Sequence, residues 1–296
     1  MSAIGFIGLG NMGLPMARNL ARAGHRLRAF DVVPASVEQA VAAGAIAATS
    51  SADASAGAEV VITMLPEGRH VREVYLGAAG VIAHAEPGAL LIDCSTIDVE
   101  TARAVNGAAG ERCFEVLDAP VSGGVAGAEK ATLTFMVGGS EAGVARARPV
   151  LAQMGKVVVH AGPSGNGQAA KICNNMMLGI SMIGVCEAFV LAERLGLAAD
   201  KLFEVSSQSS GQCWSLTNYC PVPGLVPSSP ANRGYQPGFT AAMMAKDLRL
   251  AQAAAQAVDA PTPLGAEARQ LYALFTNGGH GRLDFSAIIK MLAGSL

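Results

Sequence analysis

The stretch AIGFIGLGNMGLPMARNLARAG, residues 3–24, decides how the chain begins to fold. Ala3 to Ile7 form a short apolar run of the kind that makes a buried strand. From Asn11 onward, apolar residues recur with helical spacing until Gly24, a residue type that commonly follows the end of a helix. The stretch therefore predicts a strand that passes through a glycine-rich turn into a helix.

The turn reads GLGNMG over residues 8–13 and matches G-x-G-x-x-G. In that motif the first glycine makes the turn, the second lets a pyrophosphate approach the backbone, and the third packs helix against strand. The helix N-terminus adds N–H donors and a partial positive charge. The residues predicted to bind the pyrophosphate of a dinucleotide are Gly8, Gly10, Asn11, Met12 and Gly13. The alternative is a glycine-rich turn that binds nothing.

Asp31 strengthens the dinucleotide prediction, because it ends the next strand at about the spacing that the motif requires. A carboxylate at this place binds the adenosine ribose hydroxyls and repels a 2′-phosphate. Val32 and Val33 follow, so no arginine stands directly after Asp31 to hold such a phosphate. The sequence therefore predicts NAD rather than NADP.

Further apolar runs alternate with helical segments as far as Gly162. The predicted strands are residues 26–31, 59–66, 89–96, 113–124, 132–139 and 156–162. This alternation predicts a mostly parallel sheet that is covered by helices on both faces. Ligands of such sheets bind at the carboxyl ends of the strands. Met64, Leu65 and Pro66 end one strand and Thr96 another, so we expect them beside the ribose and nicotinamide, although each could be an ordinary turn.

The pattern changes after Gly162. Residues 168–196 read as one long helix, residues 221–239 as a proline- and glycine-rich loop that could form an active-site wall, and residues 240–258, 263–279 and 285–293 as further helices. The sequence predicts an α/β domain over residues 1–163 and an all-α domain over residues 164–296, with the long helix between them.

Lys171 lies in that helix within GNGQAAKICNNMMLGISMIGVCEAF, residues 165–189, which otherwise reads as protein interior. Asn175 is four residues further on and shares its helix face. Burial lowers the pKa of a lysine, and a lysine tuned toward neutrality can act as a general acid/base. Lys171 could then remove a proton from a substrate hydroxyl while hydride leaves the same carbon. The alternative is a lysine whose ammonium group reaches solvent from the first turn of the helix.

The strand end DAPVSGG, residues 118–124, offers a second binding element. The hydroxyl of Ser122 and the unobstructed backbone N–H groups of Gly123 and Gly124 could hold a small carboxylate. The alternative is a flexible turn.

Composition excludes several other classes of protein. The net charge of −2 and the lack of a basic tract argue against nucleic-acid binding, and the six cysteines have neither CxxC nor zinc-ligand spacing. No basic leader precedes the first strand, so we expect a cytoplasmic protein. The uncharged run 172–186 falls short of the roughly 20 residues that span a bilayer. Because only 15% of residues are charged, apolar surface and a homo-oligomer are expected.

Together these motifs resemble the 3-hydroxyisobutyrate dehydrogenase family of β-hydroxyacid dehydrogenases over essentially the whole chain. The segments that carry the resemblance are IGFIGLGNMGLPMARNL, TMLP, LIDCST, DAPVSGG, TLTFMVGG, GQAAKICNN and MAKDLRLA. The resemblance implies a Rossmann-type N-terminal domain, a long interdomain helix and a helical C-terminal domain. It also implies Lys171 as catalytic acid/base, carboxylate binding by Ser122, Gly123 and Gly124 with help from Asn175, and cofactor contacts from Leu65, Pro66 and Thr96.

The resemblance gives two more residues a role. It implies that Lys246 reaches the nicotinamide end of NAD, where the residues alone favour a solvated lysine paired with Asp247. It places Trp214, the only tryptophan, near the substrate, where the residues alone equally allow a core anchor.

The substrate is inferred from what the family shares and lacks. The related 6-phosphogluconate dehydrogenases have a glutamate shortly after the lysine–asparagine pair, and here MMLGISMIG contains no carboxylate. Residues 213–239 look most like 3-hydroxyisobutyrate dehydrogenases, which oxidise their substrate to methylmalonate semialdehyde in valine breakdown. Tartronate semialdehyde (2-hydroxy-3-oxopropionate) reductase and oxidation of L-serine or another small 3-hydroxy acid stay open as alternatives. A non-catalytic NAD-binding protein is the alternative of another class.

Overall fold

The computed structural model describes residues 1–296 as two compact units. The first comprises Met1–Lys171 and the second Ile172–Leu296. The division falls inside the long helix α9 (Asn166–Arg194), so each unit is described by itself.

The first unit is built on one mixed sheet. Its strands are β1 (Ala3–Ile7), β2 (Arg26–Phe30), β3 (Ile46–Ala47), β4 (Val60–Thr63), β5 (Leu90–Asp93), β6 (Glu115–Asp118), β7 (Val121–Ser122), β8 (Leu133–Gly138) and β9 (Gly155–Gly162). They run in the order β3-β2-β1-β4-β5-β6-β8-β7, and β9 pairs with β8. Neighbours from β3 to β6 are parallel, whereas β8 is antiparallel to β6 and β7. The predicted mostly parallel, Rossmann-type sheet is confirmed.

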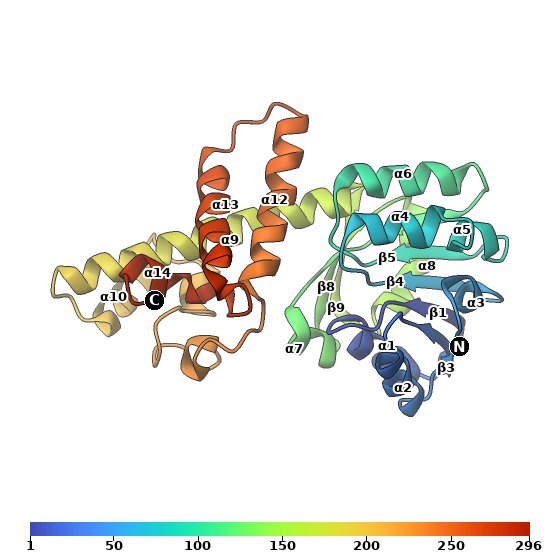
Figure 1. The fold of residues 1–296 in the computed structure, drawn as a ribbon, viewed down its shortest axis with the longest axis horizontal. Helices are drawn as coiled ribbons and strands as arrows, with labels where there is room; N and C mark the ends of the chain where they lie inside the picture. The colour runs from blue at the N-terminus through green and yellow to red at the C-terminus, as the bar shows by residue number, and fades with distance from the viewer. The chain divides into compact units, whose positions relative to one another are not determined.

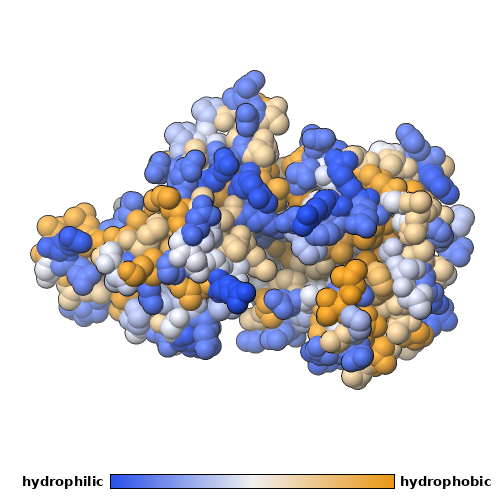
Figure 2. Space-filling view, viewed as in Figure 1, coloured by the Kyte–Doolittle hydropathy of each residue, from blue (hydrophilic) through white to orange (hydrophobic).

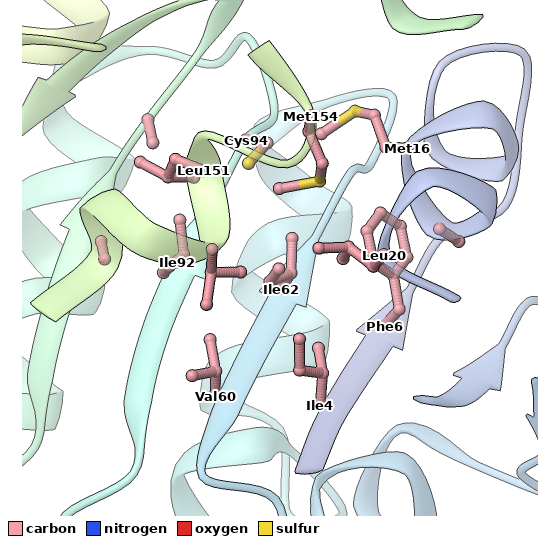
Figure 3. Packing of buried hydrophobic residues seen from close by; sticks show 14 of the residues in the cluster. Ile4, Phe6, Met16, Leu20, Val60, Ile62, Ile92, Cys94, Leu151 and Met154 are labelled. Atoms are coloured by element: carbon pink, nitrogen blue, oxygen red, sulfur yellow. The ribbon is translucent and has the colours of Figure 1, made fainter. Parts of the chain in front are cut away.

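Helices cover both faces of this sheet (Figure 1). They are α1 (Gly13–Arg22), α2 (Pro34–Ala42), α3 (Ser51–Ser55), α4 (Gly68–Leu76), α5 (Val81–His84), α6 (Val99–Gly110), α7 (Gly124–Glu129) and α8 (Glu141–Leu151). Alternate strand residues point to opposite faces, as the pleat requires. Ile4, Phe6 and Ile62 pack with α1 and α8 on one face (Figure 3), while Val61 and Leu91 pack with α3 to α6 on the other.

The second unit is helical, as predicted. Beside most of α9 it contains α10 (Ala199–Ser207), α11 (Trp214–Thr217), α12 (Ala241–Ala257), α13 (Pro263–Phe275), α14 (Ile288–Ala293) and the short turns η1 (Pro230–Arg233), η2 (Thr276–His280) and η3 (Phe285–Ala287). Helices α12 and α13 lie side by side (Figure 1). Met182 and Cys186 of α9 and Met244 of α12 belong to the core of this unit.

Some local details differ from the sequence-based prediction. The predicted strand 113–124 is two strands, because the segment at Ala119 and Pro120 separates β6 from β7. Pro120 has no N–H to continue a ladder. The strand β3 and the helix α10 were not predicted, since β3 has two residues and α10 has no buried side chain to mark an apolar face.

The helix α9 is long and apolar enough to cross a membrane by length and composition alone, although its uncharged run 172–186 is short for that purpose. Of its most apolar window, 44% is buried inside the structure. A core helix of a folded domain meets the same test, and residues of α9 form part of the core of the second unit.

Candidate active site

The glycine turn after β1 has the geometry that a pyrophosphate-binding turn requires. Gly8 has a φ of +95°, and a Cβ there would overlap the carbonyl oxygen of Met64. A Cβ on Gly13 would overlap the carbonyl oxygen of Gly8, so α1 packs closely against β1. A Cβ on Gly10 would meet no atom within 4 Å. The turn is thus filled at its first and third glycines and open at its second, which fits the approach of a pyrophosphate to the backbone.

Asp31 follows β2 and lies directly beside this turn. Its Oδ2 accepts a hydrogen bond from the backbone N–H of Leu9 at 2.6 Å, and its Oδ1 accepts one from Val33 at 2.8 Å. A carboxylate has about four acceptor sites, so capacity for ribose hydroxyls remains. Val32 is 85% exposed and carries no positive charge. The turn and Asp31 together fit NAD.

The ends of β4 and β5 are joined by a buried hydrogen-bond network around Asp93. The Oδ1 atom of Asp93 accepts hydrogen bonds from the hydroxyls of Thr63 and Ser95, both at 2.6 Å. The Ser95 hydroxyl in turn accepts the backbone N–H of Leu65 at 2.8 Å. The Thr63 hydroxyl lies 3.1 Å from that of Tyr75 on α4. Asp93 was not predicted as a site residue, yet it fixes the two strand ends that carry Leu65 and Thr96.

Burial raises the pKa of Asp93 from the usual 3.8 to about 6, and its hydrogen bonds from Ser95 and Thr63 oppose this rise only in part. Between about pH 4 and pH 6 the folded protein therefore binds more protons than the unfolded chain, and stability falls as the pH rises. A difference of about two pKa units corresponds to about 3 kcal/mol. Urea unfolding should show Asp93→Asn gaining about that much relative to the wild type between pH 4 and pH 6. Parallel stability curves for the two proteins would contradict this expectation.

The predicted carboxylate cradle lies between β7 and α7. Gly123 has a φ of +133° and Gly124 a φ of +62°, so both positions favour glycine. Ser122 is half-buried at the end of β7 and Gly123 is exposed. The hydroxyl and two accessible backbone N–H groups therefore occur together in one turn, although nothing in this geometry selects a particular ligand.

Lys171 lies in the second turn of α9, and its side chain is only 6% exposed. This burial contradicts the alternative that its ammonium group reaches solvent. Asn175, one helical turn further on, is 2% exposed. The predicted acid/base is thus a buried lysine.

Asn175 is held by two neighbours in the second unit. Its Nδ2 donates to Oδ2 of Asp247 on α12 at 2.5 Å, and its Oδ1 accepts a hydrogen bond from Asn174 at 3.0 Å. Lys246 lies 3.5 Å from Oδ1 of the same Asp247, which is 3% exposed. Asp247 therefore links two predicted site residues. Sequence reasoning considered it only as a partner for Lys246, because 72 residues separate it from Asn175.

Trp214 begins α11 and is 50% exposed, which excludes a buried core anchor. Its ring stacks on Tyr219 at a centroid distance of 5.0 Å, and Tyr219 contacts Phe285. The buried carboxylate of Asp284 holds this region by accepting hydrogen bonds from Tyr219, Gly238, Phe239 and Ser286. The predicted loop 221–239 is therefore anchored at its carboxyl end, through a residue that sequence reasoning missed.

Known proteins resemble the chain over its whole length. A family model described as the NAD binding domain of 6-phosphogluconate dehydrogenase matches residues 3–162. A second, described as NAD-binding of NADP-dependent 3-hydroxyisobutyrate dehydrogenase, matches residues 165–292. The chain is 53% identical over 296 residues to a 3-hydroxyisobutyrate dehydrogenase of Pseudomonas aeruginosa, with 99% of each chain covered.

Two further relatives bear on the substrate. An NAD-dependent L-serine dehydrogenase of Pseudomonas aeruginosa is 50% identical over 291 residues, with 98% of each chain covered. A solved structure of 3-hydroxyisobutyrate dehydrogenase from Mycobacterium tuberculosis with L-serine is 51% identical, covers 99% of both chains and has a TM-score of 0.95. With these identities, its NAD-binding turn and its buried lysine, the chain belongs to the 3-hydroxyisobutyrate dehydrogenase family of β-hydroxyacid dehydrogenases.

Proposed function

We propose that this chain oxidises 3-hydroxyisobutyrate to methylmalonate semialdehyde with NAD, with Lys171 as the general acid/base. The observation that carries the proposal is the burial of Lys171 in a chain of this family. Support comes from the first unit itself, where the glycine turn, Leu65, Thr96 and the Asp118 end of β6 all follow carboxyl ends of neighbouring parallel strands. Ligands of such sheets bind at that edge.

The residues would divide the chemistry as follows. Bound NAD accepts a hydride from the carbon that bears the hydroxyl. Lys171 takes the proton of that hydroxyl, and Ser122 with the N–H groups of Gly123 and Gly124 binds the carboxylate. Asn175 keeps one N–H for substrate, because an amide nitrogen has two donors and Asp247 accepts only one.

The cofactor and the remaining substrate contacts are proposed for the other sequence-predicted residues. Trp214 would flank the substrate, and Lys246 would reach the nicotinamide end of NAD. The other proposed cofactor contacts are Gly8, Gly10, Asn11, Met12, Gly13, Asp31, Met64, Leu65, Pro66 and Thr96.

L-Serine is the second candidate substrate. It is also a small acid with a hydroxyl on the third carbon, and two relatives carry its name. Tartronate semialdehyde reduction is the third activity to test. A protein that binds NAD without catalysing a reaction would reduce no cofactor with any acid.

The proposal is tested by a panel of acids. Purified protein is mixed with NAD or NADP and 3-hydroxyisobutyrate, L-serine or 3-hydroxypropionate, and reduced nicotinamide is followed at 340 nm; tartronate semialdehyde with NADH tests the reverse direction. The highest kcat/KM is expected for 3-hydroxyisobutyrate with NAD. A higher value for L-serine or tartronate semialdehyde would replace the proposed substrate.

Asp31 should set the choice between the two cofactors. A hydrogen bond to a charged group contributes about 1.5–3 kcal/mol, so Asp31→Asn should lower the ratio of kcat/KM for NAD to that for NADP by at least about tenfold. Glu38→Gln, which removes an exposed carboxylate from neighbouring α2, is the matched control and should leave the ratio unchanged. Equal effects of both substitutions would show that only overall charge matters.

We also propose a cytoplasmic homo-oligomer, a dimer or tetramer. Exposed apolar side chains of the second unit support it, among them Leu191, Leu195 and Val205, and Figure 2 shows apolar surface at the end formed by α9 and α10. The domain boundary at residues 163–164 is likewise kept as a proposal, between the matched segments 3–162 and 165–292.

A further inference from the structure

Gln168 is a buried side chain whose two polar atoms both bind the turn after β5. Its Oε1 accepts the backbone N–H of Ile97 at 3.0 Å, and its Nε2 donates to the carbonyl oxygen of Ser95 at 2.8 Å. The side chain is 0% exposed. The amide therefore brackets Thr96, a proposed cofactor contact, from both sides. Neither hydrogen bond is visible in the sequence, because more than 70 residues separate the partners.

The first turn of α9 is also fixed by Asp118 at the end of β6. Its Oδ1 accepts the N–H of Gly165 at 2.7 Å, and its Oδ2 accepts the N–H of Gln168 at 2.9 Å. A Cβ on Gly167 would approach Oδ2 of Asp118 to 2.8 Å. The start of the helix has little room to move relative to the sheet edge.

A continuous path of hydrogen bonds thus leads from the cofactor side to the lysine helix. The N–H of Leu65 donates to the Ser95 hydroxyl, and the Ser95 carbonyl accepts from Gln168. Lys171 follows three residues later on the same helix, about 4.5 Å along its axis. Displacing the Ser95–Ile97 turn therefore displaces the part of α9 that carries Lys171.

We propose that Gln168 is a positioning residue that couples the Thr96 turn to Lys171, so that cofactor binding at the turn orders the start of the lysine helix. This inference rests on the proposed function for the role of Lys171. The bidentate amide geometry gives it a specific form, since both a donor and an acceptor are required at residue 168.

The test compares Gln168→Leu with Asn166→Ala. Leucine is similar in size and removes both hydrogen bonds to the turn. Asn166 is the matched control, because it also lies in the first turn of α9 but donates to the carbonyl oxygen of Ala161 before the helix. Hydrogen exchange of residues 166–171 is measured with and without NADH, and kcat is measured with 3-hydroxyisobutyrate.

NADH should slow exchange at residues 166–171 in the wild type and in Asn166→Ala but not in Gln168→Leu. The kcat of Gln168→Leu should fall by about tenfold or more, since small misplacements of catalytic groups cost that much. Wild-type protection and kcat in Gln168→Leu would overturn the inference. The exchange measurement needs no substrate, so it stands even if the chain oxidises none of the acids.

Gln168→Glu keeps the test decisive if the leucine variant fails to fold. A glutamate at residue 168 loses the donor to Ser95, but its protonated form regains it. The ratio of its kcat to that of the wild type should therefore rise as the pH is lowered. A ratio that does not change with pH would overturn the inference.

Discussion

Replacement of Lys171 by alanine should lower kcat by about a thousandfold, because a positioned general acid/base contributes roughly 10²–10⁴ to the rate. NADH affinity should stay within about twofold, since the glycine turn and Asp31 are untouched. Stopped-flow turnover and NADH fluorescence titration measure the two quantities separately.

Two further variants show whether the effect belongs to this amine. Lys171→Arg keeps a positive charge that does not titrate in proteins, so it should be as inactive as the alanine variant. Lys201→Ala removes an exposed lysine of α10 and should leave kcat unchanged. Near-normal turnover in Lys171→Ala would reject Lys171 as the acid/base.

Two glycines of the same turn should fail in opposite ways when changed to alanine. Gly13→Ala should lose about 3 kcal/mol or more of folding stability, because its Cβ overlaps the carbonyl oxygen of Gly8 and backbone must move. Gly10→Ala should stay within about 0.5 kcal/mol of the wild type, since its Cβ meets no protein atom. It should nonetheless weaken NADH binding by at least about tenfold, because the methyl group occupies the path by which the pyrophosphate approaches.

Gly107→Ala is the matched control for the turn. This glycine is exposed in α6 with no atom near its modelling Cβ position, so alanine should leave NADH binding unchanged and favour the helix. Urea unfolding and NADH titration of all three variants check the pattern. Undiminished NADH binding by Gly10→Ala would contradict the placement of the pyrophosphate at this turn.

The parts of the fold that the sequence predicts are those set by local patterns. The strand, turn and helix of residues 3–24 are adjacent in the chain, and each glycine has a separate steric reason. The apolar length of α9 is likewise visible in the residues themselves. In contrast, β3 exists only through its pairing with β2, which no two-residue pattern reveals.

The site divides in the same way. Asp31 and Lys171 stand out because their residue types are unusual in their surroundings. Asp93, Asp118, Gln168 and Asp247 act through hydrogen bonds to distant residues, so only the folded chain brings their partners together. A buried carboxylate in an apolar strand was a recognisable signal for Asp93, because buried charge requires a partner.

Hydride transfer to NAD is tested most directly with 3-hydroxyisobutyrate that carries deuterium on the carbon bearing the hydroxyl. With wild-type protein and NAD, mass spectrometry should find one deuterium in the reduced nicotinamide and none of that label in water, at a rate that Lys171→Ala lowers by about a thousandfold. Unlabelled reduced cofactor, or no reduction at all, would contradict the account.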